Sequence, residues 1–192
     1  MGLFEVLSTV IGALDRAGAE HMISGSVASA RHGEARATQD IDIVVDATAS
    51  QMQDLVAQLT SSGMYVGDGL EALRHRTQFN AIDTTTGWKV DLIILKDRPY
   101  SRTEFERRIR TEIGGVSVCI VSAEDSILSK LEWARSSRSE RQLRDVASLV
   151  SVNGAALDWQ YIRDWAVKLD VADLLAEVLN DVEFPSPDEP AE

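Results

Sequence analysis

Hydrophobic and polar positions follow helical spacing in some stretches of residues 1–121 and strand-like spacing in others. Apolar residues three and four positions apart in the stretch 3–14 predict an amphipathic helix that ends near Gly18. The run 40–46 is rich in β-branched residues and predicts a buried strand. The other elements expected here are strands at 21–24, 77–82, 88–95 and 116–121, and helices at 27–32, 52–59 and 99–110.

From residue 122 onward the pattern changes to helical periodicity. The stretches 122–153 and 158–179 carry apolar residues at helical spacing, and the Pro-rich acidic tail 184–192 is expected to be disordered. Strands mixed with helices and then helices alone indicate an α/β (α+β) fold. We expect a mixed sheet flanked by helices in residues 1–121, followed by a helical region in residues 122–183.

The composition is that of a globular protein with a strong negative charge. Of 192 residues, 44% are hydrophobic and 26% are charged, which excludes collagen-like, low-complexity and wholly disordered chains. A formal net charge of −12 argues against a general nucleic-acid-binding protein, because such binding depends on neutralising phosphates. The stretch 96–144 has a local excess of basic residues and can still hold a phosphate-bearing ligand.

The cysteine content and the lack of long apolar runs indicate the compartment. The single cysteine, Cys119, cannot form an internal disulfide, and the apolar run 116–121 around it predicts a buried thiol. No stretch approaches the ~18 apolar residues of a membrane span. The first residues lack the basic region of a secretion signal. We therefore expect a cytoplasmic protein with no membrane partner.

Three carboxylates are candidates for metal chemistry. Asp40 and Asp42 are two apart on one predicted strand, so both side chains point to the same face while Ile41 and Ile43 point to a core. Two adjacent carboxylates repel each other unless a cation neutralises them, and their oxygens suit Mg²⁺. Asp91 lies in the apolar run of another predicted strand. If the two strands are neighbours, the three carboxylates form a site for phosphoryl chemistry.

Each carboxylate also has a purely structural interpretation. Asp40 is suited to cap a turn, and Asp91 is suited to an ion pair with Lys89 or with an arginine. The occurrence of all three together favours function. A turn at Gly25-Ser26 strengthens that case, because it lies between a predicted strand and a predicted helix. Glycine allows a ligand close to the backbone, and amides at a helix N-terminus attract phosphate.

These residues resemble the nucleotidyltransferase superfamily, which has the polymerase-β-like fold. The resemblance is carried by Gly25-Ser26, by Asp-Ile-Asp-Ile at 40–43, by Asp91 on a later strand, and by Arg-Ala-Thr-Gln at 36–39. A second block, 122–131 followed by 141–146, is similar to the Lys and Arg…Asp motifs of the AbiEii-like toxin branch. The two blocks together cover roughly residues 20–150.

The resemblance implies transfer of a nucleoside monophosphate (NMP) from a nucleoside triphosphate (NTP) to a hydroxyl acceptor, with Mg²⁺ or Mn²⁺ as cofactor. It implies that Asp40, Asp42 and Asp91 hold the metals and that Asp91 also activates the acceptor. The nucleotide-binding residues implied are Gly25, Ser26, Arg36, Lys130 and Asp145. Read as ordinary residues, Lys130 is a solvated helix residue and Asp145 is an ion-pair partner of Arg141 or Arg144.

The acceptor stays open among an RNA end, a protein and a small molecule. The toxin branch implies an RNA end and a cognate antitoxin as partner, whereas the acidic charge favours a cationic small molecule of the aminoglycoside type. A non-catalytic nucleotide-binding or interaction protein with the same fold is a third possibility. Two arginine-rich segments, 98–110 and 135–144, line a nucleotide or RNA channel or else form ion pairs with Glu104, Glu106 and Glu140.

Overall fold

The computed structural model describes residues 2–33 and 40–181. These residues fall into two compact units. The α/β unit contains residues 2–28 and 40–122, and the helical unit contains residues 29–33 and 123–181. The predicted disordered tail 184–192 lies outside the described residues.

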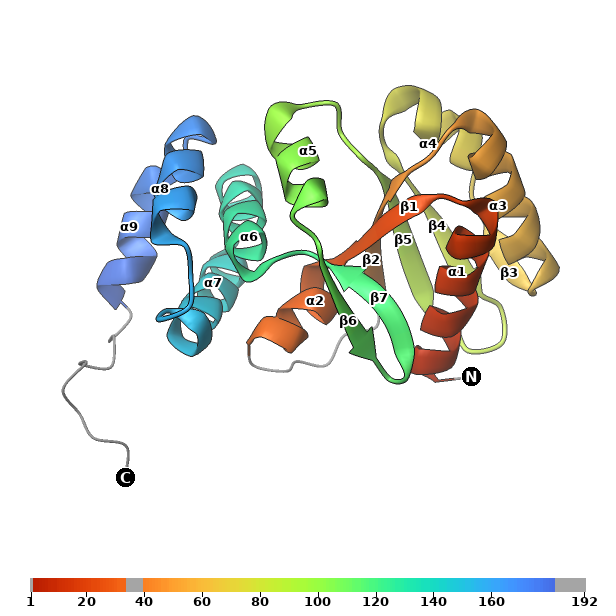
Figure 1. The fold of residues 1–192 in the computed structure, drawn as a ribbon, viewed down its shortest axis with the longest axis horizontal. Helices are drawn as coiled ribbons and strands as arrows, with labels where there is room; N and C mark the ends of the chain where they lie inside the picture. The colour runs from red at the N-terminus through yellow and green to blue at the C-terminus, as the bar shows by residue number, and fades with distance from the viewer. Residues whose placement is uncertain (1, 34–39, 182–192) are drawn as a thin grey trace. The chain divides into compact units, whose positions relative to one another are not determined.

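The α/β unit is built on a mixed sheet, which the described residues form from seven strands in the order β3-β4-β5-β2-β1-β7-β6 (Figure 1). β2 pairs in parallel with β5 and antiparallel with β1, and β1 is parallel to β7. The two outer pairs, β3 with β4 and β6 with β7, are antiparallel, as is β4 with β5. The strands are β1 Glu20–Ser24, β2 Asp40–Asp46, β3 Met64–Val66, β4 Gln78–Asp83, β5 Lys89–Ile94, β6 Ile109–Ile113 and β7 Val116–Ile120.

The core of this unit lies between one face of the sheet and a layer of helices. Alternate residues of β2, among them Ile41 and Ile43, are fully buried on that face, as the strand pattern predicts. The helix α1 (Leu3–Ala17) buries its apolar stripe there and packs on α3 (Ala49–Ser61), which in turn contacts α4 (Gly69–His75) (Figure 1). Burial of this face leaves the opposite face of β2 and β5 to carry polar residues.

The predicted helix 99–110 is wrong in its second half. The helix α5 covers only Pro99–Glu106, and Arg110 lies instead on β6. The reason is the turn Gly114-Gly115, in which both residues have positive φ, a conformation that joins two antiparallel strands tightly. The hairpin partner β7 therefore draws Ile109–Ile113 into the sheet.

Two further elements were not predicted. The strand β3 has only three residues, and α4 is a seven-residue helix capped by Asp68, whose side chain accepts a hydrogen bond from the Glu71 amide at 2.9 Å. Elements this short carry too few periodic positions to give a pattern in the sequence. The prediction for Cys119 is also wrong: its side chain is half-buried, because Val118 and Ile120 on either side of it face the core.

The helical unit is built mainly from α6 (Ala123–Ser137), α7 (Glu140–Asn153), α8 (Trp159–Lys168) and α9 (Ala172–Asp181). The helix α6 packs on α7 and α8, and α9 contacts α7 and α8. The expected helical stretch 122–153 is interrupted where Arg138 takes a left-handed conformation, after which Ser139 begins a new helix. The helix α2 (Gly25–His32) contributes residues to both units. No helix in the described ranges is long and apolar enough to cross a membrane.

Candidate active site

The register of the sheet brings the predicted carboxylates onto neighbouring strands. Asp42 of β2 lies directly opposite Asp91 of β5, and Asp40 lies opposite Lys89. Residues that face each other across a pair of strands project to the same side, and so do residues two apart on one strand. Asp40, Asp42, Lys89 and Asp91 therefore share the face of the sheet that is turned away from Ile41 and Ile43. The two strands are neighbours, which was the condition for the three carboxylates to share a site.

A polar row crosses four strands at this level of the sheet. Ser24, the last residue of β1, pairs with Asp42, and Asn80 of β4 pairs with Asp91. Ser24, Asp42 and Asn80 are half-buried, whereas Asp91 is buried. Asn80 was missed by the sequence analysis because it was one polar residue in an ordinary alternating strand. The pairing of β4 with β5 alone assigns it to this row.

Lys89 provides the positive charge next to these carboxylates. Its Nζ donates a hydrogen bond to Asp91 Oδ2 at 2.9 Å and lies 3.5 Å from Asp40 Oδ1. The hydrogen bond to Asp91, with the charges of Asp91 and Asp40, raises the pKa of Lys89 above its usual value. The ion pair of Asp91 with Lys89, one of the two structural interpretations of Asp91, is thus present.

This contact engages only one of the two carboxylate oxygens of Asp91. Its side chain is 11% exposed, and its Oδ1 atom is fully buried without a hydrogen-bond partner. A buried carboxylate oxygen that lacks a partner costs free energy, about 1–3 kcal/mol or more for a charged group. Such a cost is maintained at sites that bind a cation or a reacting group. The unpartnered oxygen makes Asp91 a candidate for a functional carboxylate.

Gly25 fits tightly against Asp42. Its φ of +60° lies in the left-handed region, and a Cβ atom there would lie 1.9 Å from Asp42 Oδ2. Only glycine meets both conditions without displacing the carboxylate. Gly25 begins α2, so the first backbone amides of that helix lie beside the carboxylates. Ser26 follows as the second residue of the helix and is half-buried.

The residue types on this face suit a hard divalent cation. Asp40, Asp42 and Asp91 offer carboxylate oxygens on one face, and one buried oxygen of Asp91 has no other partner. Within residues 2–33 and 40–181, however, no three His, Cys, Asp or Glu side chains are close enough together to hold a metal ion. The Lys89 ammonium lies between Asp40 and Asp91 in this conformation. The three-carboxylate metal site therefore stays a prediction.

Lys130 and Asp145 lie together in the helical unit. The Lys130 side chain on α6 is 9% exposed and its Nζ contacts Asp145 Oδ2 of α7 at 2.8 Å and Gln142 Oε1 at 3.3 Å. The interpretation of Lys130 as a solvated residue is wrong, because the packing of α6 against α7 buries it. Asp145 does pair with a cation, and Lys130 is one such partner. The nucleotide-binding role of this pair stays a prediction.

The arginine-rich segments are largely engaged in ion pairs. Arg102 contacts Asp97 at 2.7 Å, and Arg108 contacts Glu20 at 2.7 Å. In the second segment Arg144 contacts Glu140 at 3.8 Å, as predicted, and Arg135 pairs with Asp170. The predicted nucleotide ligand Arg36 lies outside the described residues.

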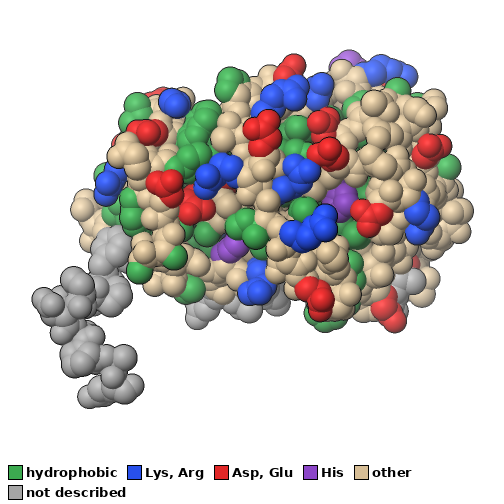
Figure 2. All heavy atoms as spheres, viewed as in Figure 1, with side chains coloured by type: hydrophobic (Ala, Val, Ile, Leu, Met, Phe, Trp, Pro, Cys, Tyr) green, Lys and Arg blue, Asp and Glu red, His purple; other side chains and the backbone are tan. Residues whose placement is uncertain are grey.

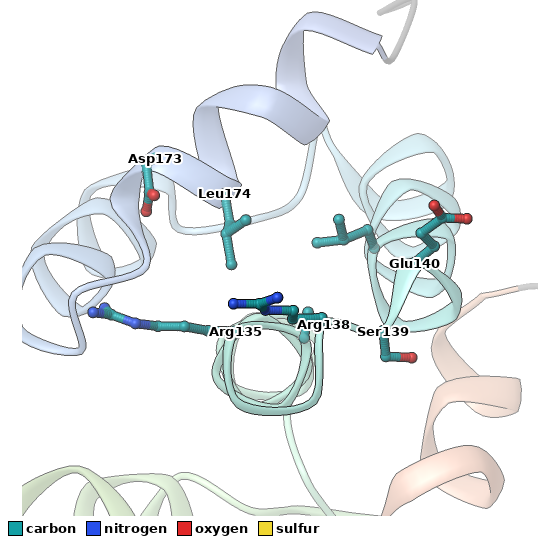
Figure 3. Close-up of a pocket in the computed structure, with 8 residues that line it drawn as sticks. Arg135, Arg138, Ser139, Glu140, Asp173 and Leu174 are labelled. Atoms are coloured by element: carbon teal, nitrogen blue, oxygen red, sulfur yellow. The ribbon is translucent and has the colours of Figure 1, made fainter.

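A shallow pocket of about 300 Å³ lies in the helical unit (Figure 3). Arg138 and Leu174 point toward its centre, whereas Arg135 extends outward on the side of Asp173 and Glu140 points away from the pocket. Its wall includes residues of the arginine-rich segment 135–144, but none of the predicted catalytic residues and none of the described nucleotide-binding candidates. It is lined by Ala134, Arg135, Arg138, Ser139, Glu140, Leu143, Asp173 and Leu174. We therefore place the candidate active site on the sheet.

Comparison with solved structures shows which known fold this is. The antibiotic-resistance factor ANT(2'')-Ia matches 92% of this chain over 96% of its own length, with a TM-score of 0.59 and 16% identity. A nucleotidyltransferase-like protein from Paracoccidioides brasiliensis matches 95% of this chain over 94% of its own, with a TM-score of 0.55 and 17% identity. The lincosamide antibiotic adenylyltransferase LnuA matches 78% of this chain over 95% of its own length, with a TM-score of 0.51 and 15% identity.

These likenesses show that the chain has the nucleotidyltransferase fold, a mixed sheet flanked by helices, as the sequence predicted. No protein-family model matches the chain, and no curated protein matches it in sequence. At this level of identity the likeness concerns the fold, so the function has to be argued from the site.

Proposed function

We propose that this protein is a nucleotidyltransferase that uses a divalent metal, Mg²⁺ or Mn²⁺, to move an NMP from an NTP to a hydroxyl acceptor. The observation that carries the proposal is the pairing of Asp42 with Asp91 beside Gly25 on one face of the sheet. That arrangement places carboxylate oxygens next to the residue that begins α2. The shared fold of the nucleotidyltransferases supports the same conclusion.

The three carboxylates would have different roles. Asp40 and Asp42 would hold the metal from β2, and Asp91 would hold it from β5. The bound metal supplies charge neutralisation on the phosphates and Lewis-acid activation. Asp91 would also activate the acceptor hydroxyl by accepting its proton. The acceptor oxygen then bonds to the α-phosphorus, the bond from that phosphorus to the bridging oxygen breaks, and pyrophosphate leaves.

The triphosphate would be bound by backbone and by a lysine. Gly25 and Ser26 open α2, whose first amides and N-terminal dipole attract phosphate oxygens. The Ser26 hydroxyl adds a hydrogen-bond donor. Lys130 is proposed as a phosphate ligand, with Asp145 holding its ammonium in a defined position at 2.8 Å. Catalysis would rest on positioning and charge neutralisation.

A small cationic molecule is the acceptor that the charge favours. The net charge of −12 attracts cations and repels polyanions such as RNA. On the face seen in Figure 2 the basic and acidic side chains of the described residues are interspersed, not gathered by sign. Two of the matching proteins are bound to antibiotics or their products, adenylyl-2''-tobramycin in one case and lincomycin in the other.

An RNA end is the second candidate acceptor. With that acceptor, the protein would be the toxin of a toxin–antitoxin pair. What favours it is the contact between Lys130 and Asp145, the charged residues of the sequence block that resembles the AbiEii-like branch. A cognate antitoxin would then be the partner. A gene for a small DNA-binding protein directly upstream would support this alternative.

An acceptor screen tests the proposal. The purified protein is incubated with NTPs labelled on the α-phosphate, Mg²⁺ or Mn²⁺, and either tobramycin, lincomycin or total RNA. We expect transfer of label to a small molecule, release of pyrophosphate, and loss of both without metal or in Asp42→Asn. Label on RNA would select the toxin alternative. NTP binding by calorimetry without metal, and no turnover on any acceptor, would indicate a non-catalytic nucleotide-binding protein.

A further inference from the structure

Lys89 occupies an unusual place for a lysine. It lies on β5 two residues before Asp91, directly opposite Asp40, and its ammonium contacts a carboxylate oxygen of each. Two of the three carboxylates proposed to hold the metal are therefore already neutralised in part by the protein itself. In the described part of the chain, Lys89 is the cation within ion-pair distance of Asp91.

The contact is more than a surface ion pair. The Asp91 side chain is 11% exposed and the Lys89 side chain 35% exposed, so water screens the pair less than it screens pairs on the open surface. The row beside it holds the half-buried Asp42 against Gly25. Without a cation at this place, carboxylates on adjacent strands would repel one another at short range.

We propose that Lys89 is a built-in counter-ion that competes with the divalent metal for the carboxylates of Asp40 and Asp91. This inference rests on the proposed function, because it assigns a competitor to the same site. The ammonium contacts the carboxylates of Asp40 and Asp91, which would also hold the metal, so the two cations would compete for the same negative charge. Lys89 therefore stabilises the metal-free site and weakens the binding of free metal.

Competition from Lys89 would also affect the order in which metal and nucleotide bind. Lysine carries its charge on a flexible four-carbon stem, so the ammonium can leave the carboxylates without movement of β5. A metal that arrives with a triphosphate brings phosphate oxygens, which provide new partners for the released ammonium. The site then binds the metal–nucleotide complex in preference to the free ion.

Metal titration without nucleotide tests the proposal. Mn²⁺ is titrated by calorimetry into the wild type, Lys89→Met and Lys89→Arg, with Lys96→Met as the matched control. Lys96 is an exposed lysine just after β5, and its loss changes the net charge equally without touching the carboxylates. We expect Lys89→Met to bind Mn²⁺ roughly tenfold more tightly than the wild type, since a competing charge is removed. Lys89→Arg and Lys96→Met should stay close to the wild type.

Thermal unfolding gives a second readout that needs no metal. Metal-free Lys89→Met should unfold at a lower temperature than metal-free Lys96→Met. Added Mn²⁺ should raise the unfolding temperature of Lys89→Met by more than it raises that of the wild type. Unchanged or weaker Mn²⁺ binding by Lys89→Met would overturn the proposal. An equal gain in Mn²⁺ affinity in Lys96→Met would overturn it too, because the effect would then come from net charge alone. NMP transfer by the wild type is measured separately. If the wild type transfers NMP but Lys89→Met binds Mn²⁺ no more tightly, the role of Lys89 is rejected and the proposed function stands.

Discussion

Asp42 and Asp91 lie directly opposite each other on the parallel strands β2 and β5, while their neighbours Ile43 and Leu92 are fully buried on the other face. The sheet thus holds two acidic side chains side by side by the same pairing that builds the core. Movement of either carboxylate out of the row would require a shift in the register of a central strand, which would turn apolar residues out of the core.

Neutralising one member of this pair should abolish transfer and leave the fold intact. Asp42→Asn or Asp91→Asn removes a charge that holds the metal, and we expect a loss of about a thousandfold in kcat/KM. Asp46→Asn is the matched control, because Asp46 ends the same strand at an exposed position, outside the polar row. Label transfer and thermal unfolding measure the two effects. Full activity in Asp42→Asn would refute the assignment.

Gly25→Ala should displace the Asp42 carboxylate, because the new methyl group would overlap Oδ2. We expect a destabilisation of about 1–2 kcal/mol from the left-handed backbone, and a large loss of metal binding. Gly87→Ala is the control: its φ is +77°, yet nothing lies within 4 Å of the added Cβ. It should show the backbone cost alone, with unchanged metal binding. Urea unfolding and Mn²⁺ titration separate the two terms, and equal effects in both variants would contradict the steric argument.

Lys130 and Asp145 should be coupled energetically. Lys130→Met leaves a largely buried carboxylate without its lysine partner and should cost about 3 kcal/mol in the free energy of unfolding. Asp145→Asn should cost a similar amount, and the double variant less than the sum of the two. If Lys130 also binds phosphate, the double variant recovers stability without recovering NTP affinity. Recovery of both would limit the pair to a structural role.

Asp83 should make stability depend on pH in the acid range. Its carboxylate accepts hydrogen bonds from Thr86 Oγ1 and from the Thr85 amide, which lower its pKa below the ordinary value of 3.8. A lowered pKa in the folded state contributes stability above the unfolded value, and this is lost as the pH falls through the folded value. Asp83→Asn should therefore be less stable than the wild type near neutral pH, with a difference that narrows below pH 3.8. Urea unfolding across that range measures it, and a constant difference would exclude this linkage.

Local patterns in the sequence predicted a good part of the site. The spacing of Asp40 and Asp42 on a strand fixes their common face, since alternation is a property of the extended backbone itself. The position of Gly25 directly before a helix was also predicted. By contrast, the end of α5 and the strand β6 were missed, because the hairpin with β7 outweighs a polar sequence with moderate helical character.

The sequence by itself therefore determined most of the elements, their apolar faces and the residue types able to hold a metal. The tertiary structure alone decided which strands are neighbours, and with that the pairing of Asp91 with Asp42, the addition of Asn80 to the row, and the position of Lys89 between Asp40 and Asp91. The physical reason is that strand pairing joins residues far apart in the chain. Its register is chosen by burial of the whole sheet face, which no local window of sequence contains.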